Sequence, residues 1–349
     1  MPARIALGLV GAGRMGTTHA HLLARAVPEV RLVAIADVDV VRARVLAEEL
    51  DVPAVFDDHR DLVGAPGVDA VLVAASTSRH LEVIRDAAAA GRDILCEKPL
   101  ALTIAETDAA AAAAERAGVR LQVGFMRRWD ADYRRARARV AAGEIGRPFL
   151  FKSLQFDAEL PPLAFCDPAV SGGILVDMGI HEFDLARWLT GDEVVEVHAY
   201  GGVLAHPELA PLGDVETAVV NLRFTGGALG SVELTRSAAY AEDVRTEVVG
   251  ELGSAFVGLL PLTAGALAVP GRIAVDATPL DVSRFAAALV AQARAFARAI
   301  LDDRPVEVGG AESRAALAIG LAAHRSMHEG RPVAVTEVTG ADETEASAG

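Results

Sequence analysis

Hydrophobic residues in the first 120 positions fall into short, uninterrupted runs that alternate with segments of helical periodicity. The runs predict strands and the periodic segments predict helices. The expected strands cover residues 4–10, 31–36, 69–74 and 93–96, and the expected helices cover 15–26, 40–50, 79–90 and 103–117. Strands that are apolar on both faces and separated by helices indicate a parallel sheet with helices on both sides.

The pattern changes after residue 123. A predicted helix at 131–141 is followed by a strand at 149–156, a loop rich in proline and a helix at 173–189. Alternating polar and apolar residues between 194 and 258 predict antiparallel strands, and Gly226 with Gly227 marks the clearest hairpin turn. Predicted helices at 283–301 and 312–328 complete the pattern.

These patterns predict two domains, as the length of 349 residues also does. Residues 1–123 form an α/β domain on a parallel sheet. Residues 124–340 are expected to form an α+β domain with a large, mostly antiparallel sheet, whose last helices pack back on the first domain. Residues 341–349 form an acidic tail that we expect to be disordered.

The composition argues against several classes of protein. A net charge of −15 without a basic tract disfavours nucleic-acid binding. We find no apolar run of about 18 residues that would span a membrane. The apolar segment 5–10 is short and leads into glycines, so we expect no signal peptide. Cys96 and Cys166 show no metal-binding or disulfide-framework spacing, and we expect two reduced thiols in a cytoplasmic protein.

A glycine-rich loop joins the first strand to the first helix. Gly11, Gly13 and Gly16 follow the pattern G-x-G-x-x-G, which lets the backbone and the helix N-terminus approach a pyrophosphate. Asp37 ends the second strand, where a carboxylate can accept hydrogen bonds from the adenosine ribose and repel a 2′-phosphate. We therefore predict NAD rather than NADP, with Arg14 and Met15 as further contacts, although Arg14 can contact either cofactor.

Lys98 is one of two lysines among the 33 basic residues, and Lys152 is the other. It lies in the tripeptide Glu97-Lys98-Pro99, directly after the strand at 93–96. The carboxyl ends of parallel strands face the cofactor crevice, and Pro99 restricts the backbone of Lys98. A lysine there can hold a hydroxyl oxygen and take part in proton transfer, so we favour a catalytic Lys98 over a solvated one.

The apolar helix at 173–189 carries Asp177, His181 and Asp184 at positions i, i+4 and i+7, on one face. A buried carboxylate needs a partner or a polar cavity, so this stripe indicates an ion-pair network or an active site. Histidine titrates near neutral pH, and we predict His181 as a catalytic base oriented by Asp177. For Asp184 we favour an ion pair with Arg187. No further ligand lies at suitable spacing, so we expect no metal.

Taken together, these segments resemble the Gfo/Idh/MocA family of oxidoreductases over about residues 4–336, and within it the bacterial inositol 2-dehydrogenases. The resemblance rests on the glycine loop, Asp37, Ser76 to His80, Glu97 to Pro99, Gln122 to Tyr133, Gly143 to Gly146, the helix from Asp177 to Trp188, and Asp214 to Ala218.

The resemblance implies a Rossmann domain over residues 1–123 and a homotetramer joined through the open sheets of the second domain. It implies NAD-dependent oxidation of myo-inositol to scyllo-inosose, with Lys98 placing the substrate oxygen, His181 as base and Asp177 as its partner. The further residues that it implies are Ser76, Thr77, His80, Glu97 and Gln122 for the cofactor, and Arg128, Gln155, Asp157, Tyr240 and Glu242 for the substrate.

Two segments depart from the inositol enzymes, and both are expected near the substrate. Inositol enzymes commonly carry a basic or polar run where this chain has Ser-Leu-Gln-Phe-Asp at 153–157. Glu242 stands where an aromatic residue is common in those enzymes. Another sugar, an anhydrosugar or an aminocyclitol therefore remains open, since Glu242 suits an amine. Two other functions remain as alternatives: an NAD-dependent glycoside hydrolase, and a non-enzymatic NAD-sensing regulator, which would have no use for Lys98, Asp177 and His181.

Overall fold

The computed structural model describes residues 4–258, 262–269, 272–277 and 282–340, with the backbone alone between 262 and 283. Its contacts divide the chain into two compact units. Unit 1 comprises Met1–Asp130 and Phe285–Ala315, and unit 2 comprises Ala131–Arg284 and Ala316–Gly349. The division thus falls after residue 130 rather than 123, and unit 1 includes a segment from late in the chain. The acidic tail expected at 341–349 lies outside the described residues.

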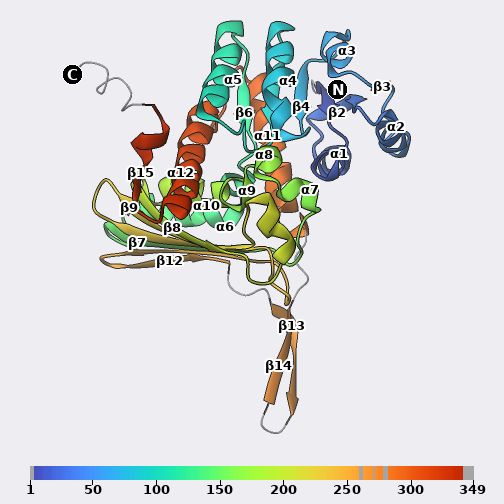
Figure 1. Cartoon of the computed structure of the whole chain (residues 1–349). Coiled ribbons are helices and arrows are strands. Elements are labelled where there is room, and N and C mark those ends of the chain that lie inside the picture. The colour runs from blue at the N-terminus through green and yellow to red at the C-terminus, as the bar shows by residue number, and fades with distance from the viewer. Residues whose placement is uncertain (1–3, 259–261, 270–271, 278–281, 341–349) are drawn as a thin grey trace, which may run out of the picture. The chain divides into compact units, whose positions relative to one another are not determined.

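Unit 1 is built on a six-stranded parallel sheet with the order β3-β2-β1-β4-β5-β6 (Figure 1). Leu9 of β1 pairs with Ile35 of β2 on one side and with Leu72 of β4 on the other, and all three are fully buried. The strand order changes direction between β1 and β4, which is where open α/β sheets bind their ligands. The strands are β1 (Ile5–Val10), β2 (Val30–Ala36), β3 (Ala54–Phe56), β4 (Ala70–Val73), β5 (Asp93–Cys96) and β6 (Leu121–Val123).

Helices cover this sheet and supply its core. A helix from late in the sequence, α11 (Ala286–Leu301), buries Ala293, Phe296 and Ala297 in the cluster that contains Leu7 and Leu9 of β1. This burial explains why the segment 285–315 belongs to unit 1. The other helical segments of the unit are α1 (Arg14–Ala26), α2 (Val40–Glu49), α3 (His59–Gly64), α4 (Thr77–Ala89), α5 (Ile104–Ala117) and η1 (Met126–Trp129).

Unit 2 contains a seven-stranded sheet with the order β12-β11-β7-β10-β9-β8-β15. Its pairs are antiparallel except β7 with β10, which run parallel with Phe156 opposite Thr235. Strands β13 (Leu262–Val269) and β14 (Arg272–Ala277) form a separate antiparallel pair. The large sheet consists of β7 (Pro148–Phe156), β8 (Val194–Gly202), β9 (Thr217–Phe224), β10 (Leu229–Thr235), β11 (Asp243–Gly250), β12 (Gly253–Val257) and β15 (Val333–Ala334).

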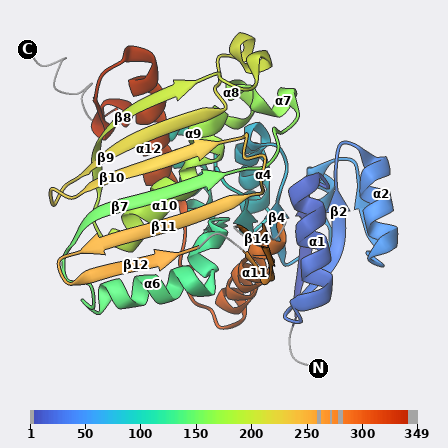
Figure 2. The same cartoon turned by 90° about the horizontal axis from the view of Figure 1, so that it is seen from below.

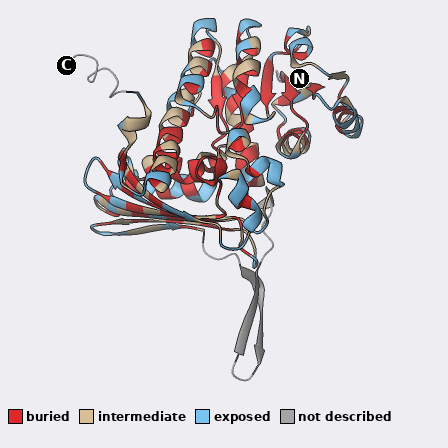
Figure 3. Ribbon diagram, viewed as in Figure 1, coloured by how far each residue is buried: buried red, intermediate tan, exposed pale blue. Residues whose placement is uncertain are grey.

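The two faces of this sheet differ in burial. In β9, Ala218, Val220, Leu222 and Phe224 are buried while the residues between them are exposed, as alternation along a strand requires. Figure 3 shows buried and exposed stretches alternating in this sheet. Figure 2 shows the strands in front of α9, α10 and α12, which lie behind the sheet. The helical segments are α6 (Ala131–Ala141), α7 (Leu163–Cys166), α8 (Pro168–Ser171), α9 (Gly173–Asp177), α10 (Gly179–Thr190), α12 (Gly310–Glu329), which begins in unit 1, η2 (Pro207–Leu212), η3 (Val282–Phe285) and η4 (Val335–Val338).

The predicted helix at 173–189 is divided into α9 and α10 at Met178. The His181 amide donates to the Met178 carbonyl, three residues back instead of four, so the helix tightens at this point. Gly179 begins α10 against β10, where a Cβ atom would lie 3.1 Å from the Leu234 side chain. The proline-rich loop also contains two short helices, α7 and α8, that the hydrophobic pattern did not predict. Every helix in the described ranges is too short or too polar to cross a membrane.

Candidate active site

The glycine-rich loop of unit 1 has the geometry of an anion cradle. Gly11 has φ +97°, and a Cβ atom on it would lie 2.6 Å from the backbone of Ala74. A Cβ atom on Gly16 would lie 1.8 Å from the Gly11 carbonyl oxygen, whereas one on Gly13 would meet nothing within 4 Å. Gly11 and Gly16 are therefore required by packing, while Gly13 leaves open space at the start of α1. The first-turn amides, including those of Arg14 and Met15, have no carbonyl partner within the helix and suit a pyrophosphate.

Asp37 follows β2 and is fastened to this loop. Its Oδ2 accepts a hydrogen bond from the Ala12 amide at 2.6 Å, and its Oδ1 accepts from the Asp39 amide and the Arg42 side chain. Burial alone would raise the pKa of Asp37, but these donors outweigh it and hold the pKa below its usual value. A carboxylate has about four acceptor sites, so three donors leave room for a ribose hydroxyl. The loop, the helix terminus and Asp37 together fit the diphosphate and ribose of NAD.

The turn after β4 is tied to the Glu97-Lys98-Pro99 segment through His80. Ser76 precedes the first residue of α4, Thr77, and His80 lies in the next turn. The His80 ring is buried, with Nδ1 2.9 Å from the Pro99 carbonyl and Nε2 3.0 Å from the Ala75 carbonyl. Burial lowers the pKa of His80 despite these two acceptors. A neutral imidazole carries one N–H, so His80 donates to one of these two carbonyls and contacts the other, between the turn that begins α4 and the segment that bears Lys98.

Lys98 follows β5, and the peptide bond between Lys98 and Pro99 is cis. Glu97 is buried beside it, with its Oε1 2.6 Å from Nε2 of His19 and its Oε2 accepting from the Lys98 amide. Burial would raise the pKa of Glu97, but the His19 and Lys98 contacts lower it below the usual value. Gln122 of β6 donates its side-chain amide to the Gln292 carbonyl of α11. Glu97 thus braces the backbone of Lys98, whereas Gln122 joins β6 to α11.

The junction of α9 and α10 in unit 2 carries the predicted acid–base pair. Asp177 is the last residue of α9, and the buried His181 is the third residue of α10. Asp177 Oδ2 accepts from Nη2 of Arg236 at 3.3 Å. Arg236 also donates from Nη1 to Asp214 Oδ2 at 2.7 Å, and it is fully buried. The Asp177 carboxylate is therefore held by a buried arginine that the sequence did not single out.

Several predicted substrate residues lie at one end of the strands in the seven-stranded sheet of unit 2. Strands β7 and β10 end there side by side, and β11 begins there with Asp243 opposite Phe156. Gln155 donates its amide to Asp157 at 3.1 Å, and the Tyr240 hydroxyl donates to Asp243 at 2.7 Å. Burial and this hydrogen bond raise the pKa of Tyr240 to about 12. Glu242 lies between Tyr240 and Asp243, whereas Arg128 belongs to η1 of unit 1.

The preferred partner of Asp184 was predicted wrongly. Arg187 forms an ion pair with Glu193, at 2.5 Å and 2.7 Å, and not with Asp184. Asp184 is fully buried on the inner face of α10, while Arg187 lies in the last turn and reaches the segment that follows the helix. Spacing of three residues along a helix allows an ion pair, but the different exposure of the two side chains decided against it here.

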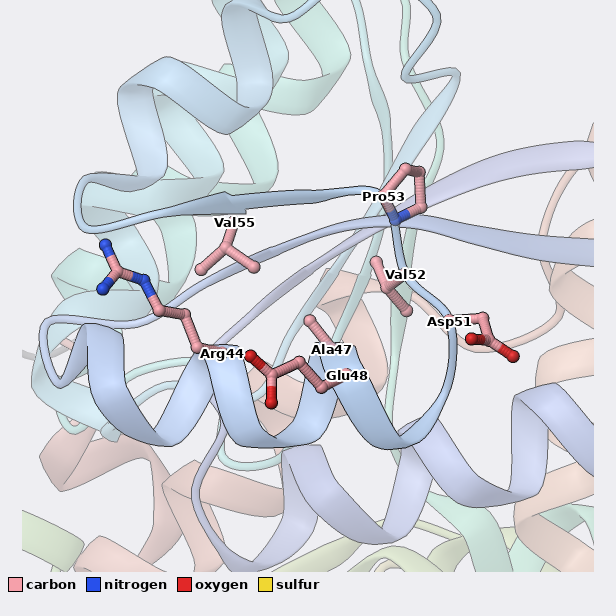
Figure 4. Close-up of a pocket in the computed structure, with 7 residues that line it drawn as sticks. All are labelled: Arg44, Ala47, Glu48, Asp51, Val52, Pro53 and Val55. Atoms are coloured by element: carbon pink, nitrogen blue, oxygen red, sulfur yellow. The ribbon is translucent and has the colours of Figure 1, made fainter.

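Unit 1 has two other features that do not involve its predicted site residues. A hollow beside α2 is lined by Arg44, Ala47, Glu48, Asp51, Val52, Pro53 and Val55 (Figure 4). Residues 51–53 precede β3, so the hollow lies where this strand begins and not at the edge where the strands end. Among the described residues, His59, Glu82 and Asp86 are near enough to share a metal ion. His59 of α3 already bonds Asp86 of α4 at 2.8 Å and so joins these two helices, while Glu82 pairs with Arg79 within α4.

Comparison with known families assigns both parts of the chain. Residues 5–125 match the model of the oxidoreductase family with an NAD-binding Rossmann fold, and residues 133–256 match that of the GFO/IDH/MocA C-terminal domain. The chain belongs to the GFO/IDH/MocA family of NAD-binding oxidoreductases. The predicted family, the Rossmann fold, the second α/β domain and the NAD cofactor are therefore confirmed.

The relatives of this GFO/IDH/MocA protein match it over nearly its whole length. It is 38% identical to the myo-inositol 2-dehydrogenase of Thermotoga maritima, over 96% of this chain and 99% of the relative. It is 36% identical to the scyllo-inositol 2-dehydrogenase (NAD(+)) of Bacillus subtilis, over 95% and 97%. The crystal structure of scyllo-inositol dehydrogenase from Lactobacillus casei with NAD(H) and scyllo-inositol superposes with a TM-score of 0.88, at 30% identity, over 95% of this chain and 99% of that one.

Reasoning from the sequence missed three residues of this GFO/IDH/MocA chain that support the predicted site: His19, Arg42 and Arg236. Arg42 lies five positions after Asp37 on the following helix, and this spacing could have suggested their contact. His19 contacts Glu97 from 78 positions away, and Arg236 contacts Asp177 from 59 positions away. No local pattern distinguishes these two residues, because their partners are brought to them only by the fold.

Proposed function

We propose that this chain is an NAD-dependent inositol dehydrogenase that oxidises a ring hydroxyl of a cyclitol, with myo-inositol converted to scyllo-inosose as the leading reaction. The observation that carries this proposal is the match over nearly the full length to the myo- and scyllo-inositol 2-dehydrogenases. The structure described for the Lactobacillus casei relative contains NAD(H) together with scyllo-inositol.

In the proposed reaction, Lys98, Asp177 and His181 are the catalytic residues. His181 accepts the proton of the reacting hydroxyl on its imidazole, Asp177 orients that imidazole and stabilises its charged form, and Lys98 holds the oxygen as it becomes a carbonyl. When bound, NAD⁺ supplies the hydride acceptor. The position of Lys98 directly after β5 and the arginine-held carboxylate of Asp177 support these roles.

For the substrate we propose contacts from Arg128, Gln155, Asp157, Tyr240 and Glu242. The last four gather at one edge of the unit 2 sheet through the pairing of β7, β10 and β11. Their hydrogen-bonding groups suit a ring with several hydroxyls. Glu242 also suits an amino group, so an aminocyclitol is the second candidate, ahead of other sugars and anhydrosugars.

We further propose a homotetramer assembled through the open face of the unit 2 sheet. Tyr200 of β8 pairs with Val219 of β9 on that face, and both side chains are exposed. Soluble proteins seldom leave such apolar groups together unless another surface covers them. We place the enzyme in the cytoplasm, where the buried thiols of Cys96 and Cys166 would remain reduced.

A substrate panel tests the function directly. The purified full-length chain is incubated with myo- and scyllo-inositol, monosaccharides, an anhydrosugar and an aminocyclitol, each with NAD⁺ or NADP⁺, and NAD(P)H absorbance is followed. We expect the highest kcat/KM for an inositol with NAD⁺. A higher kcat/KM for the aminocyclitol would select the second candidate. Cleavage of an aryl glycoside without net NADH would contradict the dehydrogenase in favour of a glycoside hydrolase.

A further inference from the structure

Arg236 is the largest fully buried side chain of the described residues. It directly follows β10, and its backbone amide donates to the Glu216 carbonyl. Its two terminal nitrogens bind different carboxylates: Nη1 donates to Asp214 at 2.7 Å and Nη2 donates to Asp177 at 3.3 Å. A buried guanidinium requires compensating charge, and here one cation is shared between two anions.

Arg236 is linked to both ends of α9, to its start through Asp214 and to its end through Asp177. The Oδ2 of Asp214 binds Arg236, and its Oδ1 accepts from the Ile174 amide at the start of this helix, at 3.1 Å. Gly173 has φ +70°, and a Cβ atom there would lie 2.8 Å from Asp214 Oδ1, so the contact depends on glycine. Asp177 ends the same helix and binds the other arm of Arg236. The five residues of α9 are thus held at their first turn and at their last residue.

We propose that Arg236 is a positioning residue for the catalytic pair, and that its fixed guanidinium sets the direction and the charge of the Asp177 carboxylate. This inference rests on the proposed dehydrogenase function. Arginine stays protonated throughout the working pH range, so its charge is constant. With two carboxylates around one cation, a net negative charge remains in the group. That charge stabilises His181 when it takes the hydroxyl proton.

Other titratable groups lie near Arg236 and its two carboxylates, Asp177 and Asp214. Cys166 of α7 is close enough that burial and the two carboxylates raise its thiol pKa, while Arg236 lowers it. On α12, the pKa of His324 is lowered by burial and by His328, with Asp214 acting in the opposite direction. His181 lies on α10. Apparent pKa values therefore belong to the Asp177–His181 pair within this group, not to one residue alone.

The decisive variants are Arg236→Gln and Asp214→Asn, which remove opposite charges from the same cluster. Removing the cation must raise the apparent pKa of the Asp177–His181 pair, whereas removing the anion must lower it. We expect the acid limb of the kcat/KM profile to move to higher pH in Arg236→Gln and to lower pH in Asp214→Asn. In Arg236→Gln we also expect kcat to fall at least about ten-fold, with the KM for NAD⁺ unchanged.

Arg236→Lys keeps the charge but loses the fork that reaches both carboxylates. We expect it to restore the pH profile of the wild type while recovering only part of kcat. If circular dichroism shows that Arg236→Gln does not fold, Arg236→Lys replaces it in the test. The proposal still predicts different pH profiles for Arg236→Lys and Asp214→Asn. Wild-type pH profiles in both folded charge variants would overturn the proposal.

A measurement without substrate separates this inference from the proposed function. Ring-labelled histidine in the full-length chain is titrated by NMR, and the His181 signal is assigned by its loss in His181→Asn. We expect its apparent pKa to rise in Arg236→Gln or, if that variant does not fold, to fall in Asp214→Asn. Such shifts in a protein that oxidises no inositol would uphold the role of Arg236 and refute the inositol assignment. An unshifted His181 signal in the folded charge variants would refute the role of Arg236, whatever the substrate.

Discussion

The Ala12 amide donates a 2.6 Å hydrogen bond to the Asp37 carboxylate, so the residue that follows β2 is joined to the loop that follows β1. Two separate sequence signals of dinucleotide binding therefore form one structural unit. Arg42 binds the other oxygen of the same carboxylate. These donors favour the ionised state of Asp37 over the effect of burial, and we propose that its negative charge repels the 2′-phosphate of NADP.

Asp37→Asn is expected to weaken NAD⁺ binding and to reduce the preference for NAD⁺ over NADP⁺. Hydrogen bonds to a charged group contribute about 1.5–3 kcal/mol, so the KM for NAD⁺ should rise by about ten-fold or more. Steady-state kinetics with both cofactors measures the change. Asp39→Asn is the matched control, because Asp39 is an exposed helix cap that asparagine replaces well. Unchanged KM values in Asp37→Asn would contradict the ribose contact.

The two lysines of the chain allow a matched test of catalysis. Lys98→Arg is expected to lower kcat by about 10²–10⁴-fold, because the larger, planar guanidinium cannot hold the reacting oxygen where the compact ammonium of Lys98 is proposed to hold it. Lys152 forms an exposed ion pair with Glu247, which arginine can also form, so Lys152→Arg should keep kcat within about two-fold. Equal turnover in the two variants would remove Lys98 from the catalytic set.

His181→Asn is expected to lower kcat by about 10²–10⁴-fold, while leaving NAD⁺ binding intact. The imidazole is the proposed proton acceptor, and the asparagine amide cannot accept a proton near neutral pH. Binding of NAD⁺ is followed by fluorescence titration, and turnover by NADH formation. His206→Asn, at a residue outside the proposed catalytic set, is the control. Turnover near the wild-type level in His181→Asn would argue that another group takes the proton.

His80 is expected to make the stability of the protein depend on pH. Because burial lowers its pKa from the usual 6.5, the folded chain keeps His80 neutral at a pH where the unfolded chain takes up a proton. This contribution to stability is present above pH 6.5 and is lost as the pH falls below it, at up to about 1.4 kcal/mol per pH unit. Urea unfolding from pH 7.5 to 5.5 should therefore show a smaller loss of stability in His80→Gln than in the wild type. Parallel pH dependence in the two proteins would show that His80 does not titrate in this way.

Tyr200→Glu is expected to break the proposed tetramer, because it places a charge on the exposed, apolar part of the unit 2 sheet beside Val219. Analytical ultracentrifugation gives the mass of the wild type and of the variant. Val45→Glu changes a similarly exposed valine of α2 in unit 1 and should leave the mass unchanged. A wild-type monomer, or a tetramer that tolerates Tyr200→Glu, would exclude this face as the interface.

Much of unit 1 was predictable because its signals are local. Parallel strands buried on both faces appear as apolar runs, and β5 covers the residues that the pattern predicts. The glycine loop, Asp37 and Lys98 each follow such a run, so their place at the carboxyl edge of the sheet follows from the order of the elements. The three-residue strands β3 and β6 were missed, since so short a segment has no periodicity to detect.

The unit 2 site was predictable only in part. The spacing of Asp177 and His181 indicated a shared face, but the turn at Met178 divides their helix. Asp184 and Arg187 had suitable spacing too, yet Arg187 binds Glu193. The spacing along a helix predicts which side chains can contact each other. Burial and the neighbouring elements determine which of these contacts form.

The amino-acid sequence by itself determined the parallel sheet, the dinucleotide loop and the residues that follow its strands, because these depend on neighbours within one strand–turn–helix segment. Only the tertiary structure decided that β7 runs parallel to β10 and that Arg236 holds Asp177. Those relationships join residues that are remote in the chain. In a sequence where arginine supplies nearly every positive charge, only the burial of Arg236 between two carboxylates distinguishes it from the solvated ones.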